Sequence, residues 1–178
     1  MADGLAGNAY ANRPLPIGHG QTISQPFIVA LMTHLLMPRA EHTVLEIGTG
    51  SGYQAAVLAR LVKRVIGIEI IAELAGHAAE LLHSLHLDNV DIHHGDGYLG
   101  WPECAPYDGI IVTACTPAIP PALIEQLKPG GRMVIPIGQA HAHQELRLLE
   151  KSPIGAVTAR NVLPVAFVPF TRAQQTGL

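Results

Sequence analysis

Residues 44–58, VLEIGTGSGYQAAVL, decide the fold of this chain. The apolar residues at 44–47 predict a buried strand, and the spacing of alanine and leucine after residue 53 predicts a helix. The glycines within 48–52 separate the two elements. A glycine turn between a strand and a helix lets a ligand approach the backbone at the carboxyl edge of a parallel sheet. The stretch therefore predicts a nucleotide-cofactor site.

The glycine spacing indicates which cofactor is favoured. A dinucleotide fingerprint, Gly-x-Gly-x-x-Gly, would need a glycine where this chain has Tyr53. The spacing here is Gly48, Gly50 and Gly52, and Glu46 precedes the first of them. A carboxylate at that point would repel a diphosphate, because both groups are negatively charged. It favours a cofactor that carries positive charge, such as a sulfonium with an α-amino group.

Further acids follow the next two predicted strands. Glu69 ends the strand 65–69, where its carboxylate could accept both hydroxyls of a ribose, and Asp96 follows the strand 90–93, where it could accept from an adenine amine. Together with Glu46, these acids resemble the S-adenosylmethionine site of class I methyltransferases. Each acid also has a structural alternative. Glu69 could be a surface acid, Asp96 could satisfy its own turn, and Glu46 could be anchored by backbone amides.

The order of predicted elements indicates an α/β fold: one doubly wound, mostly parallel Rossmann-like sheet with helices on both faces. The parallel strands are expected at 43–47, 65–69, 90–93, 108–113 and 132–137, and the helices at 53–63, 71–86, 120–127 and from Gln25-Pro26 to Pro38. An irregular loop is expected over 14–20, where prolines and glycines cluster. After Gly138 the helical pattern stops, so 145–150 and 162–170 predict antiparallel strands at the C-terminal sheet edge.

Composition narrows the class of protein. With 178 residues, 48% hydrophobic and 14% charged, the sequence predicts a single well-cored domain over residues 1–178. A net charge of −3, with 11 lysines and arginines and no basic run, argues against nucleic acid as the main partner. The two cysteines and the scattered histidines lack metal-ligand spacing, so no metal site is expected. Without a signal segment or a long apolar stretch, we expect a cytoplasmic monomer that does not enter membranes.

Motifs along most of the chain carry a closer resemblance. The first is the block from Ala9 to Asn12 and from Pro14 to Pro26, which ends in GHGQTISQP. The others are residues 44–58, GDGYLGW at 95–101, YDGIIVTA at 107–114, LKPGGRMVIPIG at 127–138 and FVPF at 167–170. From about Ala9 to Thr171 the chain resembles the protein-L-isoaspartate O-methyltransferase family. The QTISQP block is more specific than the glycine turn, which many methyltransferases share. The Asn/Asp-Pro-Pro-Tyr clamp of nucleobase- and glutamine-N-methylating enzymes is replaced by Thr-Ala-Cys-Thr at 113–116.

The resemblance implies a reaction and a substrate class. Family members transfer a methyl group from S-adenosylmethionine to the α-carboxylate of L-isoaspartyl residues, and more weakly of D-aspartyl residues, in damaged proteins. The ester then cyclises to a succinimide, which reopens in part to normal aspartate. A carboxylate with a pKa of about 4 is ionised at neutral pH, so the nucleophile needs no general base.

The resemblance also implies which residues form the site. Ser24 is implied as the residue nearest catalysis, hydrogen-bonded to the accepting carboxylate. The implied cofactor-binding residues are Thr22, Ile23, Ser24, Glu46, Gly48, Gly50, Gly52, Tyr53, Glu69, Ile70, Asp96, Gly97 and Thr171. Phe167 and Val168 resemble the edge strand that pairs with the substrate backbone. The alternative for Ser24 is a capping role at the helix that begins near Pro26, and Tyr53 could instead pack over the glycine turn.

The chain departs from the family at its start. Family members carry a helical segment before the Ala9–Tyr10 block, whereas eight residues precede it here, so we expect that segment to be lacking and the site to be more open. Two alternative functions therefore stay open. One is a carboxyl O-methyltransferase that modifies a dedicated peptide, and the other is a shortened, non-catalytic cofactor-binding relative.

Overall fold

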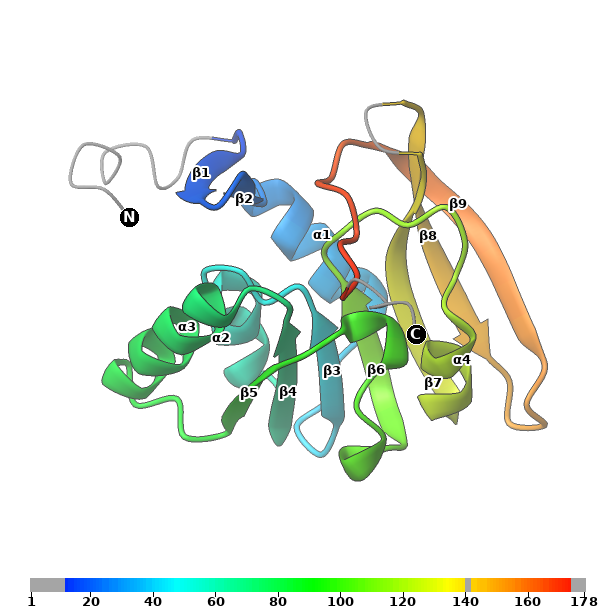
Figure 1. Ribbon diagram of the computed structural model, residues 1–178. Coiled ribbons are helices and arrows are strands. Elements are labelled where there is room, and N and C mark those ends of the chain that lie inside the picture. Colours follow the sequence, from blue (N-terminus) through cyan, green and yellow to red (C-terminus); the bar gives the residue numbers. More distant parts are fainter. Residues whose placement is uncertain (1–11, 140–141, 174–178) are drawn as a thin grey trace, which may run out of the picture.

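A computed structural model describes residues 12–139 and 142–173, so Ala9 to Ala11 of the upstream block lie outside the described residues (Figure 1). Its main sheet has seven strands in the order β5-β4-β3-β6-β7-β8-β9. The strands are β3 (Thr43–Ile47), β4 (Arg64–Glu69), β5 (Val90–His94), β6 (Tyr107–Val112), β7 (Leu127–Gly138), β8 (Gln144–Lys151) and β9 (Val157–Val165). Strands β3 to β7 pair in parallel, and β8 and β9 pair antiparallel. The predicted α/β sheet with antiparallel C-terminal strands is confirmed.

Helices cover both faces of the sheet. They are α1 (Pro26–Leu36), α2 (Tyr53–Ala59), α3 (Ala72–Ser84) and α4 (Pro121–Gln126), with the 3-10 helices η2 (Gly97–Leu99) and η3 (Pro102–Cys104). Apolar side chains of α1, α2 and α3 share one core cluster, and Leu123 of α4 belongs to the cluster on the other face. Helix α2 ends sooner than predicted because the chain turns to bond Lys63 N–H to the His42 carbonyl, which leads into β4. Among the described residues, no helix is long and apolar enough to cross a membrane.

The strand order creates a crevice at one edge of the sheet. From β3 the chain proceeds to β4 and β5 on one side, and it then crosses back to place β6 on the other side of β3. The helices that follow β3 and β6 therefore diverge at the carboxyl ends of these strands. Ligands of doubly wound sheets bind at such a switch point, and the glycine turn after β3 lies there.

The predicted loop over 14–20 is wrong in part. Residues 15–23 form a separate hairpin of β1 (Leu15–Gly18) and β2 (Gln21–Ile23), in which Leu15 faces Ile23 (Figure 1). The reversal between the strands has positive φ at Gly18 (92°), His19 (52°) and Gly20 (71°), which two glycines make accessible. Proline and glycine therefore mark a tight turn here, and the flanking residues pair.

The predicted strand over 162–170 also needs correction. Strand β9 ends at Val165, and the next residues leave the sheet edge and pair with the segment after β6. Cys115 N–H donates to Val168 O at 2.8 Å, and Phe170 N–H donates to Cys115 O at 2.8 Å. The side chain of Gln144 holds this departure, because its Oε1 accepts from Phe167 N–H at 2.7 Å and its Nε2 donates to Phe167 O at 3.1 Å. Phe167 and Val168 therefore do not lie on the sheet's edge strand.

Candidate active site

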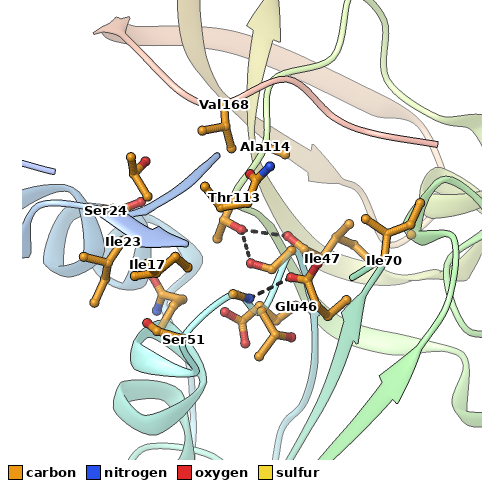
Figure 2. Close-up of a pocket in the computed structure, with 18 of the residues that line it drawn as sticks. Ile17, Ile23, Ser24, Glu46, Ile47, Ser51, Ile70, Thr113, Ala114 and Val168 are labelled. Carbon is orange, nitrogen blue, oxygen red and sulfur yellow. Dashed lines mark hydrogen bonds between the residues drawn. The ribbon is translucent and has the colours of Figure 1, made fainter. Parts of the chain in front are cut away.

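A cavity lies at the carboxyl ends of β3, β4 and β6 (Figure 2). Its wall brings together most of the predicted site residues: Thr22, Ile23, Ser24, Glu46, Gly48, Gly50, Tyr53, Glu69, Ile70, Gly97, Val168 and Thr171. Figure 2 shows Ser24 and Ile70 on opposite sides of the cavity, with Val168 near the Ser24 side. The hairpin, the glycine turn, the end of β4 and the segment after β9 thus converge on one space.

The glycine turn is held in place by a threonine that the sequence analysis missed. Gly48 has φ +86°, and a Cβ added there would lie 2.6 Å from Thr113 Oγ1. The Thr113 hydroxyl lies 2.9 Å from Ile47 O and also within hydrogen-bond distance of Gly48 O (Figure 2). Only glycine leaves room for this approach. The turn is thereby fixed against the end of β6.

Glu46 is fully buried at 0% exposure, and it lines the cavity. Within the described part of the chain, neither of its carboxyl oxygens has a hydrogen-bond partner. Burial first, and the neighbouring Glu69 second, raise the pKa of Glu46 well above its ordinary value. The alternative that backbone amides anchor Glu46 is therefore wrong. The cavity instead contains an acceptor group with no donor from the described protein.

Glu69 is buried as well, at 5% exposure, but it is bonded to the backbone. Its Oε2 accepts from Gly50 N–H at 2.8 Å, and its Oε1 accepts from Ile71 N–H at 3.0 Å. The carboxylate thus joins the glycine turn to the start of α3. An ionised carboxylate has about four acceptor positions, so each oxygen retains capacity for a ligand hydroxyl.

Gly52, Asp96 and Phe167 do not line this cavity. A Cβ on Gly52 would lie 3.3 Å from Leu82 of α3, so the lack of a side chain here permits close packing of the turn against that helix. Asp96 satisfies its own turn, which was its structural alternative, because Oδ1 accepts from Tyr98 N–H at 2.9 Å. The side chain of Gln144 is hydrogen-bonded to the backbone of Phe167, and Phe167 lines a second cavity.

Arg172 is a further residue that the sequence analysis missed. Its Nε lies 3.6 Å from Asp96 Oδ2, and its guanidinium lies 3.9 Å from the centroid of the Tyr98 ring. These contacts fasten the segment that contains Thr171 to the turn after β5. Nothing in local sequence spacing indicates a pair so far apart along the chain.

The second cavity adjoins the first at Ser24. Both cavities are lined by Thr22, Ser24, Thr113 and Val168. The remaining wall of the second cavity is uncharged and consists of Pro14, Gln25, Phe27, Ile28, Leu163, Pro164, Val165, Ala166 and Phe167. The capping role considered for Ser24 is not observed, because Gln25 is the N-cap of α1, and the Phe27 N–H in the first turn donates to Asn12 Oδ1 at 3.4 Å. Ser24 thus lies where a ligand in one cavity would meet a ligand in the other.

Among residues 12–139 and 142–173, no group of three or more His, Cys, Asp and Glu side chains could hold an ion. Two acids line the cavity: Glu46 has no hydrogen-bond partner among the described residues, and Glu69 accepts from backbone N–H groups.

Comparison with known proteins shows the family. The family model for protein-L-isoaspartate(D-aspartate) O-methyltransferase (PCMT) matches residues 1–175. The chain belongs to this family. It is 61% identical over 163 residues to protein-L-isoaspartate O-methyltransferase 2 of Syntrophobacter fumaroxidans, covering 92% of this chain and 66% of the relative. It is also 61% identical to the enzyme of that name from Polaromonas sp. strain JS666, covering 92% of this chain and 77% of the relative.

Solved structures of the family have the same fold. A protein-L-isoaspartate O-methyltransferase superposes with a TM-score of 0.78 at 33% identity, over 83% of this chain and 48% of that one. A Plasmodium falciparum PCMT in complex with S-adenosyl-L-homocysteine superposes with a TM-score of 0.77 at 26% identity, over 92% and 82% of the two chains. The present chain thus spans about half to four fifths of the length of these family members.

Proposed function

We propose that this protein transfers a methyl group from S-adenosylmethionine to the α-carboxylate of L-isoaspartyl residues, and more weakly of D-aspartyl residues, in damaged proteins. One observation carries the proposal. A cavity lined by Glu46 and Glu69 and a second, uncharged cavity meet at Ser24, in a chain of the protein-L-isoaspartate O-methyltransferase family. Two substrates that must react with each other can therefore approach one residue from two sides.

The cofactor cavity suits a cation. When bound, S-adenosylmethionine supplies an electrophilic methyl group on a positively charged sulfur. The carboxyl oxygens of Glu46, which have no donor among the described residues, fit the positively charged amino acid end of such a molecule. Glu69 retains acceptor capacity for the ribose hydroxyls, and Ile70 and Gly97 lie on the wall where the base would follow. Thr22, Ile23 and Thr171 cover the methionine end.

The second cavity suits a peptide. Its uncharged wall includes Phe167 and Val168, whose backbone lies in a segment that leaves the sheet. Ser24 would donate a hydrogen bond to one oxygen of the isoaspartyl carboxylate and direct the other oxygen toward the methyl group. Because the carboxylate is ionised near neutral pH, the protein has to position it and exclude water rather than remove a proton. Positioning of this kind lowers barriers by up to roughly 7–11 kcal/mol.

The experiment is labelled methyl transfer to an isoaspartyl peptide and to its normal aspartyl twin. Transfer to the isoaspartyl peptide alone is the expected result. Equal transfer to both peptides would instead support an enzyme for a dedicated sequence. Binding of S-adenosylhomocysteine without any transfer would support a non-catalytic relative and would overturn the proposal.

Ser24→Ala sharpens the assignment of the catalytic residue. We expect turnover with the isoaspartyl peptide to fall by about ten-fold or more, since a hydrogen bond to a charged group is lost. The affinity for S-adenosylhomocysteine, measured by calorimetry, should change much less. A variant with wild-type turnover would remove Ser24 from the mechanism.

We also propose that the protein works in the cytoplasm as a monomer and has no role on nucleic acid. The support is compositional, because the chain carries a net charge of −3 and only 11 lysines and arginines. Sedimentation of the purified protein with and without an isoaspartyl peptide would test the monomer directly.

A further inference from the structure

Gln54 lies on α2 and lines the cofactor cavity, yet neither its neighbours in sequence nor the glycine spacing indicated a role for it. The residue is only 5% exposed. Its Oε1 is buried and, among the described residues, has no hydrogen-bond partner. A buried acceptor that lacks a donor is rare in folded proteins, because such a group loses its hydration without compensation.

The direction in which Gln54 points is fixed by its hydrogen bonds. Thr33 Oγ1 lies 2.8 Å from Val29 O, which can only accept, so the single hydroxyl proton of Thr33 is donated there. The Thr33 oxygen must therefore accept from Gln54, whose Nε2 lies 2.9 Å away. The amide cannot be flipped without placing two acceptors against each other. Gln54 Oε1 is thus the atom left for the cavity.

Gln54 and Glu46 lie on the same side of the sheet. In β3 the side chains alternate, so Glu46 points to the same face as Val44, which packs in the core cluster with α1 and α2. Gln54 extends from α2, and both residues line the one cavity. Two elements therefore present acceptor oxygens, without donors among the described residues, to the same space. Both oxygens are buried, so a ligand group that donates a hydrogen bond would satisfy them.

We propose that Gln54 Oε1 accepts a hydrogen bond from the α-ammonium group of S-adenosylmethionine, with the Glu46 carboxyl group beside it. The inference rests on the proposed function, since it assigns one end of the cofactor. Of the cofactor's polar groups, the ammonium is the one that only donates and that also carries positive charge. The ribose hydroxyls have Glu69 on the neighbouring strand, the sulfonium has no N–H or O–H, and the cofactor carboxylate would be repelled by an acceptor.

The test pairs one change in the protein with one change in the ligand. Calorimetry measures the affinity of wild type and Gln54→Met for S-adenosylhomocysteine and for the analogue in which hydrogen replaces its amino group. We expect Gln54→Met to weaken S-adenosylhomocysteine binding by about ten-fold, the range for a hydrogen bond to a charged group. The affinity for the deaminated analogue should stay the same. Equal losses for both ligands, or no loss for either, would overturn the inference.

Controls separate this inference from the proposed function and from misfolding. If wild type fails to bind S-adenosylhomocysteine at all, the proposed cofactor is wrong, whereas an intact wild-type affinity with no ligand-specific loss refutes only the role of Gln54. Gln144→Met is the matched control, since Gln144 is equally buried but bonded at both ends of its amide, and it should not discriminate between the two ligands.

A second variant keeps the test decisive if Gln54→Met does not fold. Thr33→Val removes the oxygen that orients the Gln54 amide and leaves Gln54 in place. We expect a smaller loss of affinity that is again confined to the ligand with the amino group. A loss of similar size for the deaminated analogue would count against the inference.

Discussion

Two buried glutamates lie on neighbouring parallel strands at the same end of the sheet, and they differ in their hydrogen bonding. Glu69 accepts two backbone N–H groups and holds the glycine turn to α3, whereas Glu46 accepts none from the described residues. The same contrast separates Gln144, bonded through both amide atoms, from Gln54, whose oxygen is left without a partner. Groups that are satisfied build the framework. Groups that are not satisfied destabilise the ligand-free fold and are available for a ligand.

The largest effect is expected from removing the charge of Glu46. Glu46→Gln should weaken S-adenosylhomocysteine binding by about 1.5–3 kcal/mol, because a charged partner of the ligand is lost. The same variant should raise the free energy of unfolding of the ligand-free protein at neutral pH, since a glutamine has no proton for the unfolded chain to release. Calorimetry and urea denaturation measure the two quantities. A variant that binds normally, or that is less stable than wild type, would contradict the contrast.

Glu69→Ala should lower both the affinity for S-adenosylhomocysteine and the free energy of unfolding of the ligand-free protein. Binding of S-adenosylhomocysteine is expected to weaken by about 1–3 kcal/mol. The free energy of unfolding should fall as well, because Gly50 and Ile71 lose the acceptor for their N–H groups. The opposite signs of the stability changes in the Glu46 and Glu69 variants would sharpen the comparison. An unchanged calorimetric affinity would reject the ribose assignment.

An acid without partners, such as Glu46, and a hydrogen-bonded acid, such as Asp108, also differ in how their contribution to the free energy of unfolding depends on pH. The folded-state pKa of Glu46 is raised by burial and then by Glu69, so the folded protein retains a proton that the unfolded chain releases above its ordinary value near 4.5. The free energy of unfolding contributed by Glu46 therefore falls as pH rises above that value, by up to about 1.4 kcal/mol per pH unit, until the folded-state pKa is passed.

Subtracting the stability of Glu46→Gln from that of wild type at each pH isolates this contribution. Asp108 has the opposite sign: burial alone would raise its pKa, but hydrogen bonds from Lys128 and from Thr43 N–H outweigh burial and lower it. Its contribution is lost as pH falls, in both proteins, and cancels in the subtraction. A difference that does not change with pH would show that Glu46 ionises freely in the folded state.

The smallest effect is expected at Arg172. Its ion pair with Asp96 and its stacking on Tyr98 fasten the segment that carries Thr171, but the Arg172 side chain is 45% exposed. Arg172→Ala should therefore weaken S-adenosylhomocysteine binding by only about 0.5–1 kcal/mol, and high salt should reduce that difference. A loss as large as that of Glu46→Gln would make Arg172 a principal ligand contact and not a fastening.

Local sequence pattern predicted the part of the site at the glycine turn, and the family resemblance predicted residues from other elements such as Ser24 and Thr171. Glu46, Gly48 and Gly50 line the cavity because the alternation of strand and helix places every such turn at the same sheet edge. Gly52 lies outside the lining of this cavity, and its spacing does not reveal that it packs against Leu82 of α3. The hairpin at 15–23 was missed because short paired segments rich in proline and glycine look like a loop.

The remaining features depend on contacts between distant residues. Thr113 holds a turn that lies 65 residues earlier in the chain, and Gln144 redirects the segment at Phe167 from 23 residues away. The missing partner of Gln54 Oε1 is likewise a property of its surroundings, because Thr33 on another helix sets the direction of the amide. Sequence periodicity and residue spacing do not indicate hydrogen bonds between residues so far apart in the chain.

The central claim is that the unpartnered carboxyl group of Glu46 and amide oxygen of Gln54 accept hydrogen bonds from a positively charged group of the cofactor. The most direct test is to count the protons released when S-adenosylhomocysteine binds at about pH 6. Calorimetry in buffers of different ionisation enthalpy gives this number. Wild type should release a proton as the ligand's ammonium group drives Glu46 to ionise, and Glu46→Gln should release none. Binding without proton release in wild type, or with the same release in Glu46→Gln, would contradict the claim.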